Sequence, residues 1–438
     1  MASKLLDEFG LKSEKIENFI SDYETFQNKE LLDELRSKII EHLIDNNLTG
    51  NTTKEFVRNE IDKTLVGYDL SNIERSYIYN LIDNEINGYG PITDLLEDKS
   101  ITEIMVNAPS EIYVEIDGRI IRDHTISFIN DEHIVRTIQR MIQPLGRTID
   151  TTNPMVDARL KDGSRLNAVI PPLSIKGPVL TIRKFKEELA DIGDLLRNGT
   201  LTSEMARFLE ACVREKFNVI ISGGTGGGKT TLLNVLSSFI SERERIITIE
   251  DAAELRLKQS HVISLETRLT NYEGTGEITI RDLVINSLRM RPDRIIVGEV
   301  RGKEAFDMLQ AMNTGHTGSL TTMHANSPSD ALNRLESMIL MTGMEIPVKA
   351  IREYIEKAIH LVVHIERMAD GRRKVVNISE ITGFNNDIIE TKEIFSYKQT
   401  GVLPNGEIEG EFIKHKYIPN IYKSLKARGI NDLDDIFR

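Results

Sequence analysis

The chain has 438 residues, more than the ~100 to 200 residues of one ordinary domain, so the length predicts about two to four folded units. Hydrophobic residues make up 40% of the chain and charged residues 28%, which excludes a disordered protein. The 55 basic against 68 acidic side chains, a net charge of -13, argue against nonspecific nucleic-acid binding as the main task.

The cysteine content and the apolar runs indicate the cellular compartment of the protein. The single cysteine, Cys212, has no partner for an internal disulfide and is expected to be a buried apolar side chain. The first residues lack the apolar run of a signal peptide. The longest apolar stretches, 218–222 and 359–365, fall far short of the ~20 residues of a spanning helix and are expected to be buried strands. We therefore expect a cytoplasmic protein without a membrane span.

Residues 1–70 are expected to form a small helical N-terminal region. Their apolar side chains recur at helical spacing without strand-like alternation, as at Leu31, Leu32, Leu35, Ile39, Ile40 and Leu43. The acidic polar faces argue against a membrane-binding amphipathic helix, since such helices are usually basic. The pattern indicates a docking or spacing role.

Residues 71–190 are expected to form a mixed α/β domain. Short strand-like runs occur at 103–106, 111–116 and 119–122, with the hairpin turn Asp117-Gly118 before the last of them. A helix over 131–142 follows, and further strands are expected at 155–160, 165–170 and 179–185. A polar, glycine-containing linker over 191–200 is expected to join this domain to the next.

Between 201 and 366, helices alternate with short apolar strands at 218–222, 245–250, 294–298 and 319–323. This alternation is typical of a parallel sheet with crossover helices and predicts an α/β core. Residues 367–438 are expected to be a smaller mixed appendage, with a hairpin turn at Asp370-Gly371 and a helix over 420–428, after Pro419.

The core contains a phosphate-binding loop. The segment from 223 onward matches G-x-x-x-x-G-K-[ST], follows an expected strand and opens an expected helix. Backbone N–H groups of such a loop point at phosphate oxygens, a lysine reaches the β- and γ-phosphates, and Thr230 is placed to ligate Mg²⁺. The expected ATP-binding residues are Gly223, Gly224, Thr225, Gly226, Gly227, Gly228, Lys229, Thr230 and Thr231.

Two carboxylates end apolar strands of the same core. Glu250, followed by Asp251, ends one strand, where it could polarise the attacking water, and Glu299 ends another, where it could hold Mg²⁺ or its water shell. Either residue alone could also be an ordinary solvated strand-end carboxylate. Their position after a phosphate loop in one sheet favours the catalytic reading.

Two histidines, His316 and His324, flank the strand expected at 319–323. Imidazoles there could hydrogen-bond a γ-phosphate and report its loss. A zinc site is the competing chemistry, but the segment has neither a nearby cysteine nor an HExxH helix. A structural role for either histidine stays open.

Together these motifs resemble the secretion ATPase superfamily of type II and type IV secretion, and within it the CpaF branch that powers tight-adherence (Flp-type) pilus assembly. The resemblance covers residues of about 75 to 400. It is carried by Leu265-Glu266-Thr267-Arg268, Glu273 to Glu277, Arg281-Asp282-Leu283, Leu288 to Arg294, Glu299-Val300-Arg301-Gly302 and the histidine segment.

The resemblance implies a RecA-like core in which Glu250 belongs to an "Asp box", Glu299 ends an atypical Walker B strand, and both histidines form a "His box". It also implies that the preceding domain closes over the nucleotide and supplies arginines, for which we select Arg165 and Arg183. Guanidinium groups that arrive on closure neutralise the charge of the transferring phosphoryl group. Either arginine could instead be a surface ion-pair residue.

The resemblance further implies a homohexameric ring that acts on a polytopic inner-membrane platform protein. We therefore expect a Mg²⁺-dependent ATPase at the inner face of the cytoplasmic membrane that powers pilus assembly or protein secretion. One alternative is a DNA-transfer ATPase of a conjugation machine, which the acidic net charge disfavours. Another is a nucleotide-regulated scaffold with little hydrolysis, which the presence of both Glu250 and Glu299 disfavours.

Overall fold

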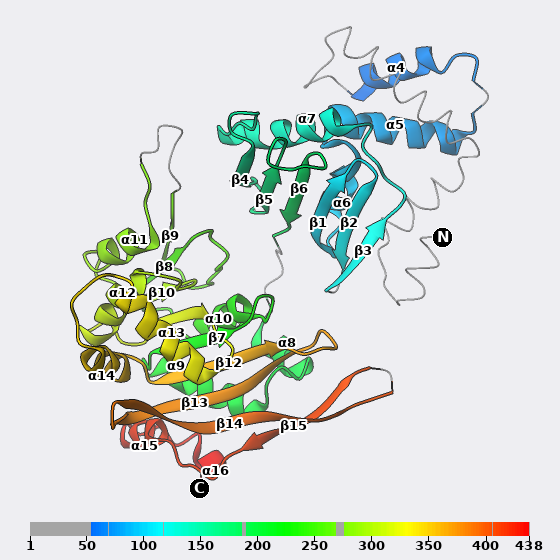
Figure 1. Cartoon of the computed structure of the whole chain (residues 1–438). Coiled ribbons are helices and arrows are strands. Elements are labelled where there is room, and N and C mark those ends of the chain that lie inside the picture. The colour runs from blue at the N-terminus through cyan, green and yellow to red at the C-terminus, as the bar shows by residue number, and fades with distance from the viewer. Residues whose placement is uncertain are drawn as a thin grey trace. The chain divides into compact units, whose positions relative to one another are not determined.

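The computed structural model describes residues 54–68, 70–116, 118–185, 190–268, 276–404 and 406–437. The chain forms two compact units, Met1–Glu187 and Glu188–Arg438, both drawn in Figure 1. Most of the helical region expected over residues 1–70 lies outside the described residues. No helix in the described ranges is long and apolar enough to cross a lipid bilayer.

The first unit is built on a six-stranded antiparallel sheet in the order β3-β2-β1-β6-β5-β4. The strand expectations for residues 71–190 are confirmed to within a few residues. The strands are β1 (Ile101–Ala108), β2 (Glu111–Ile116), β3 (Arg119–Asp123), β4 (Met155–Arg159), β5 (Arg165–Val169) and β6 (Val179–Arg183).

Helices cover this sheet. The expected helix over 131–142 is present as α7 (Asp131–Ile142), which begins at the N-cap Asn130, whose side chain accepts a hydrogen bond from the His133 backbone. Ile134 and Ile138 on its apolar face are buried against the sheet residues Ile104 and Leu180. The remaining helical elements are α4 (Lys54–Thr64), α5 (Asn72–Ile86), η1 (Gly90–Ile92), α6 (Thr93–Glu97) and η2 (Gln143–Leu145).

The second unit contains a nine-stranded sheet in the order β15-β14-β13-β12-β7-β11-β10-β8-β9. Strands β12, β7, β11, β10, β8 and β9 are parallel, as the alternation of strands and helices predicts. Their bounds are β7 (Val219–Gly223), β8 (Ile246–Glu250), β9 (Val262–Glu266), β10 (Arg294–Val297), β11 (Leu320–His324) and β12 (Leu361–Arg367).

Both faces of the parallel strands are buried, which explains their continuous apolar sequences. On β7, Val219 and Ile221 face one hydrophobic cluster and Ile220 faces the other. One cluster includes helices α9 (Ser203–Arg214) and α10 (Lys229–Ser237), with the expected buried Cys212. The other includes α11 (Ile280–Ser287), α12 (Glu304–Asn313), α13 (Pro328–Leu340) and α14 (Val348–Ala358).

The expected boundary at residue 366 is wrong, because the C-terminal residues continue the core sheet. Antiparallel strands β13 (Arg373–Asn385), β14 (Ile388–Val402) and β15 (Ile408–Lys414) add to the edge of β12. Figure 1 shows β13 and β14 as long paired strands. Helices α15 (Asn420–Ala427) and α16 (Asp434–Phe437) pack on the same core, where the carboxylate of Glu380 accepts hydrogen bonds from the backbone of Asn420 and Ile421.

The segment expected as a linker, 191–200, also has structure of its own. It contains the short helix α8 (Ile192–Arg197), which begins with a capping box between Asp191 and Asp194. Leu195 of this helix is buried in the core of the second unit. The segment is therefore part of the second unit rather than a linker.

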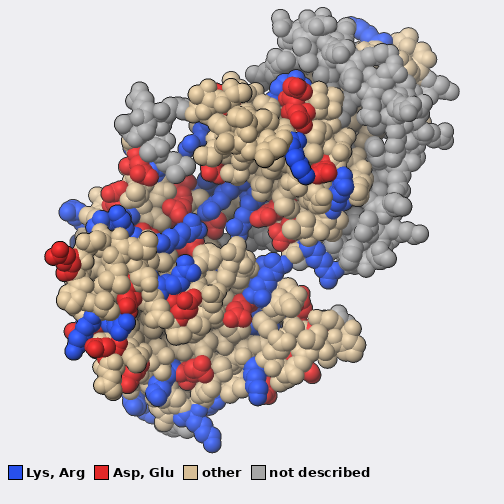
Figure 2. Space-filling view, in the orientation of Figure 1, with Lys and Arg blue, Asp and Glu red and all other residues tan. Residues whose placement is uncertain are grey.

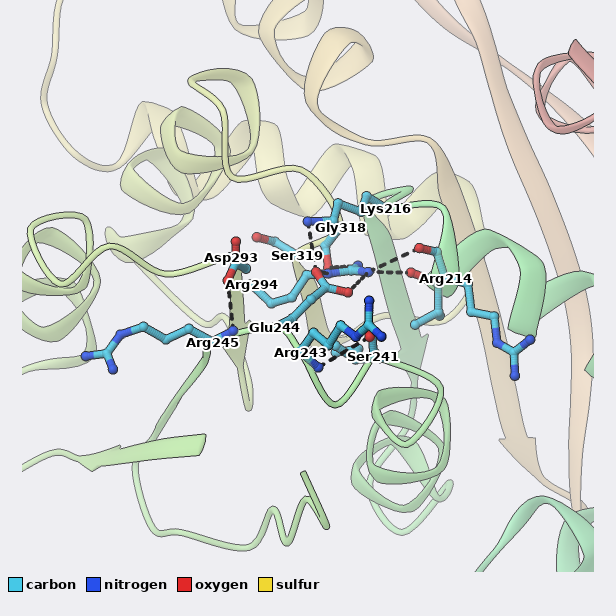
Figure 3. A network of polar contacts seen from close by, with 12 residues as sticks. Arg214, Lys216, Ser241, Arg243, Glu244, Arg245, Asp293, Arg294, Gly318 and Ser319 are labelled. Atoms are coloured by element: carbon cyan, nitrogen blue, oxygen red, sulfur yellow. Dashed lines mark hydrogen bonds and ion pairs between the residues drawn. The ribbon is translucent and has the colours of Figure 1, made fainter. Parts of the chain in front are cut away.

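A buried ion-pair network closes the edge of the core sheet at which the parallel strands begin (Figure 3). Arg294, the first residue of β10, is 0% exposed and donates to both carboxylate oxygens of Glu244, at 2.7 and 3.1 Å. Its other N–H groups reach the carbonyl oxygens of Val213 at 2.8 Å and Gly318 at 2.9 Å. A Cβ at Gly318 would lie 1.9 Å from the guanidinium, so this position requires glycine.

Candidate functional site

The phosphate loop joins β7 to α10 and is shaped by its glycines. Gly228, with φ +98, is in a conformation that residues with a side chain rarely adopt, and it directly precedes α10. A Cβ at Gly223 would lie 2.1 Å from the carbonyl oxygen of Ile365, because the β12 backbone passes directly against the loop. The loop geometry therefore depends on both its own glycines and the neighbouring strand.

Lys229 is the first residue of α10 and folds back over the loop. Its Nζ donates to the carbonyl oxygen of Gly224 at 2.9 Å, and the side chain is largely buried. The backbone N–H groups in the first turn of α10 have no acceptor within the helix and carry its partial positive charge. These features favour the binding of an anion, and Thr230 lies in the same turn.

Glu250 ends β8 and is 3% exposed. Its Oε1 accepts hydrogen bonds from the backbone of Glu254 at 2.9 Å and of Leu255 at 3.0 Å, which fix the carboxylate at the end of the strand. A Cβ at Gly298, on the neighbouring chain segment after β10, would lie 2.9 Å from Cγ of Glu250. The glycine before Glu299 thus leaves the space that this carboxylate occupies.

Glu299 lies beside His324 and Arg301, which connects the sequence motifs. His324 Nε2, at the end of β11, lies 3.0 Å from its Oε1, and Arg301 binds its Oε2. Arg301 also lies 3.6 Å from the carboxylate of Asp251. Burial and the charge of Lys229 lower the pKa of His324, which keeps the imidazole neutral at neutral pH.

The structure thus brings together Lys229, at the start of the helix that follows β7 and the loop, and Glu250, Glu299 and His324, at or just after the carboxyl ends of β8, β10 and β11. This is the edge at which open α/β sheets bind ligands.

His316, for which a contact with the γ-phosphate was also expected, is not part of this group. It precedes β11, at the opposite edge of the sheet, where its carbonyl oxygen accepts from Ser319 Oγ.

The two arginines expected from the preceding domain lie next to each other in the first unit. In the sheet register Arg165 on β5 is directly opposite Arg183 on β6 and Arg159 on β4. Directly opposed residues of antiparallel strands share a face, and like charges there destabilise the sheet. Arg183 is also paired in register with Glu103, whose carboxylate lies 3.9 Å from its Nε. A row of three arginines is consistent with a surface that meets an anion.

Arg301 and Arg159 are the residues that the sequence reasoning did not select. Arg301 follows Glu299 by two residues, so in an extended segment both side chains fall on the same side. The spacing of two residues could therefore have identified Arg301 as a partner of Glu299 from the sequence. Among the described residues, no group of three or more His, Cys, Asp or Glu side chains is arranged to hold a metal ion.

Comparisons with known proteins identify the family of this chain. Residues 85–402 match the model of a family described as type II/IV secretion system protein. A protein of Mycobacterium tuberculosis that is named for conjugal transfer is 36% identical over 305 residues, which cover 68% of this chain and 86% of that protein. The type IV secretion system protein PtlH of Bordetella pertussis is 35% identical over 311 residues, covering 65% and 91% of the two chains.

Among solved structures, the VirB11 ATPase of the Brucella suis type IV secretion system, crystallised with sulphate, is similar at 28% identity and a TM-score of 0.37. The match covers 66% of this chain and 95% of that one. The family match extends over more than half of the chain and includes the phosphate loop, both carboxylates and His324. The chain therefore belongs to the type II/IV secretion system protein family and is a secretion-type ATPase.

Proposed function

We propose that the chain hydrolyses ATP at the edge of the core sheet formed by Lys229, Glu250, Glu299 and His324, and that hydrolysis drives mechanical work on a secretion or pilus-assembly machine. The observation that carries the proposal is the position of Lys229 at the start of α10, with two carboxylates at the ends of neighbouring strands. A lysine and a helix N-terminus bind the phosphates, and a positioned carboxylate orients the attacking water.

The two carboxylates differ in their surroundings, and this difference suggests distinct roles. Glu250 is nearly fully buried and held by two backbone N–H groups, so its position is fixed and it suits the orientation of a water molecule. Glu299 is 17% exposed, its charge is already balanced by Arg301, and His324 lies 3.0 Å away. That environment suits a residue that contacts a hydrated cation rather than one that accepts a proton.

The chemistry of the site fits Mg²⁺ bound jointly by the protein and the nucleotide. A magnesium ion in such sites takes a hydroxyl from the loop and phosphate oxygens, and it keeps several waters. Thr230 would supply the hydroxyl, and Glu299 would meet the ion through water. When bound, the ion neutralises charge on the β- and γ-phosphates.

The arginine row of the first unit would complete the site when that unit closes over the nucleotide. Arg165 and Arg183 would then act on the charge that develops on the γ-phosphoryl group, since Lys229 already neutralises the ground state. This arrangement would couple hydrolysis to domain movement. The register that places these arginines in line, with Arg159 as a third member, supports the assignment.

We further propose that the chain acts as a homohexamer on a polytopic platform protein of the inner membrane, from the cytoplasmic side, as the resemblance to the CpaF branch implies. A hexamer is expected to appear as the dominant species in mass photometry with Mg²⁺ and a nonhydrolysable ATP analogue. A monomer under these conditions contradicts this part of the proposal.

A second candidate is a DNA-transfer motor, because relatives in the family carry conjugal-transfer names. Nucleic-acid binding depends on basic side chains that neutralise phosphates, and here the net charge is -13. On the visible face in Figure 2, basic and acidic side chains are interspersed. DNA-stimulated turnover together with salt-sensitive DNA binding would favour this candidate over secretion of protein subunits.

The test that separates an ATPase from a nucleotide-binding scaffold is steady-state phosphate release by the full chain with Mg²⁺ and ATP. Lys229→Ala should abolish release, whereas Lys357→Ala, at an exposed lysine on α14, should leave it unchanged. Tight ATP binding by the parent chain without phosphate release would instead identify a scaffold.

A further inference from the structure

A buried histidine of β12 connects this strand to β7 directly before the phosphate loop. His364 is 2% exposed, and its Nδ1 lies 2.8 Å from Oγ of Ser222, the residue directly before Gly223. Its Nε2 lies 3.1 Å from a carboxylate oxygen of Glu366. One imidazole therefore contacts side chains of both β7 and β12.

The hydrogen-bond roles follow from the partners. A carboxylate accepts, so Nε2 carries the proton and Nδ1 is left as an acceptor for the Ser222 hydroxyl. Burial lowers the pKa of His364, with Glu366 acting in the opposite direction, and this agrees with a neutral ring. The arrangement includes a serine, a histidine and a carboxylate, but Ser222 is 0% exposed and cannot reach a substrate. A nucleophilic role for Ser222 is therefore excluded.

The contact between Ser222 and His364 matters because Ser222 directly precedes the phosphate loop. Gly223 is held so tightly against the carbonyl oxygen of Ile365 that a Cβ there would lie 2.1 Å away, so small shifts of β7 against β12 disturb the loop directly. Ser222 and His364 are opposite each other in the parallel register of these two strands. The side-chain bond between them acts at the last residue before the loop begins.

We propose that His364 is a positioning residue of the nucleotide site: by binding Ser222, it fixes the start of the phosphate loop at the end of β7 against β12. The proposal rests on the proposed function of the loop in ATP binding. His364 itself touches no expected ligand atom, since it lies behind the loop in the interior of the sheet.

The same strand offers a matched control. His360 directly precedes β12 and is also packed against β7, but at the other edge of the sheet. Its Nδ1 accepts from the backbone N–H of Asn218 at 3.1 Å, and its ring packs on Phe217. His360 and His364 thus both connect β12 to β7, and the phosphate loop follows at the His364 end. Loss of either imidazole should reduce the stability of the core.

The test is to measure the dissociation constant of a fluorescent ATP analogue, the KM for ATP and kcat for full-length variants. His364→Leu and Ser222→Ala should each weaken analogue binding and raise KM by roughly tenfold, the effect of losing about one positioning hydrogen bond. The double variant should lose little more than either single one, because both changes remove the same bond. His364→Asn retains an acceptor near the place of Nδ1 and should recover much of the loss.

His360→Leu should lower the melting temperature but leave the dissociation constant and KM within about twofold of the parent, while Lys229→Ala removes binding in the same assay. The proposal is overturned if Ser222→Ala and His364→Leu bind the analogue like the parent, or if His360→Leu loses as much affinity as His364→Leu. If His364→Leu does not fold, the affinities of Ser222→Ala and His364→Asn for the analogue test the proposal instead. A parent chain that does not bind ATP overturns the proposed function as well, whereas ATP binding by the parent with unaffected variants overturns the positioning role alone.

Discussion

Removing the guanidinium of Arg294 tests how the core sheet is held at its loop-distal edge (Figure 3). In Arg294→Met, Glu244 loses two hydrogen bonds of 2.7 and 3.1 Å, and the carbonyl oxygens of Val213 and Gly318 lose theirs. Breaking a buried ion pair by removing one partner costs ~3 to 5 kcal/mol, mainly because the remaining charge stays buried. Lys216, 2.9 Å from Glu244, offsets part of that cost, so we expect about 3 kcal/mol.

The measurement is equilibrium urea unfolding of the full chain together with hydrogen exchange of peptides from β8 and β10, which report the second unit specifically. The double variant Arg294→Met/Glu244→Leu removes both charges and should be clearly more stable than Arg294→Met alone. A loss below about 1 kcal/mol in the single variant, or a double variant that is no more stable than the single one, would refute the reasoning.

Three further predictions concern the loop, the arginine row and the response to acid. Lys229→Ala should lose tight ATP binding by isothermal titration calorimetry while its circular dichroism spectrum stays that of the parent; undiminished affinity would contradict the loop assignment. Arg165→Ala and Arg183→Ala should bind ATP normally but slow single-turnover hydrolysis more than Arg119→Ala on β3 does, and equal rates in all three would make the row ordinary surface charge. Burial alone would raise the pKa of Glu244, but hydrogen bonds from Arg294 and Lys216 outweigh burial and hold the pKa below its usual value. The stability that this carboxylate contributes is therefore complete above the usual pKa of a glutamate and is lost as the pH falls through the lowered pKa of the folded state. The difference in unfolding free energy between the parent and Glu244→Gln should therefore be full at neutral pH and shrink in acid, and a difference independent of pH would count against it.

Much of the fold could be predicted because the burial of each strand determines its pattern of apolar and polar residues. The strands β7, β8, β10 and β11 are buried on both faces and appear as short apolar runs, so their positions were found to within about a residue. β9 was missed because it is an edge strand with exposed polar residues such as Ser264 and Glu266. The strands β13 to β15 were taken for a separate appendage, since their polar positions do not show which sheet they join.

The residues of the candidate site were likewise predictable only in part. The phosphate loop and the strand-end carboxylates were predictable because their chemistry fixes residue types and spacing. The sequence did not show which of His316 and His324 lies at the site. The five-residue strand β11, with a rise of ~3.3 Å per residue, lies between them and places them at opposite ends of the strand. The contact between Ser222 and His364 joins residues 142 positions apart, and no local pattern indicates it.

We propose that Glu250, at the end of β8, and Glu299, just after β10, drive hydrolysis of ATP bound at the loop. Single-turnover hydrolysis and nucleotide affinity of Glu250→Gln and Glu299→Gln, with Glu266→Gln as control, test these roles. Glu266 ends β9 and is paired in register with Glu250, one strand further from the loop. We expect affinity within a few-fold of the parent, hydrolysis slower by ~10² or more in both site variants, and parental rates in the control. Hydrolysis near the parental rate in both site variants would contradict it.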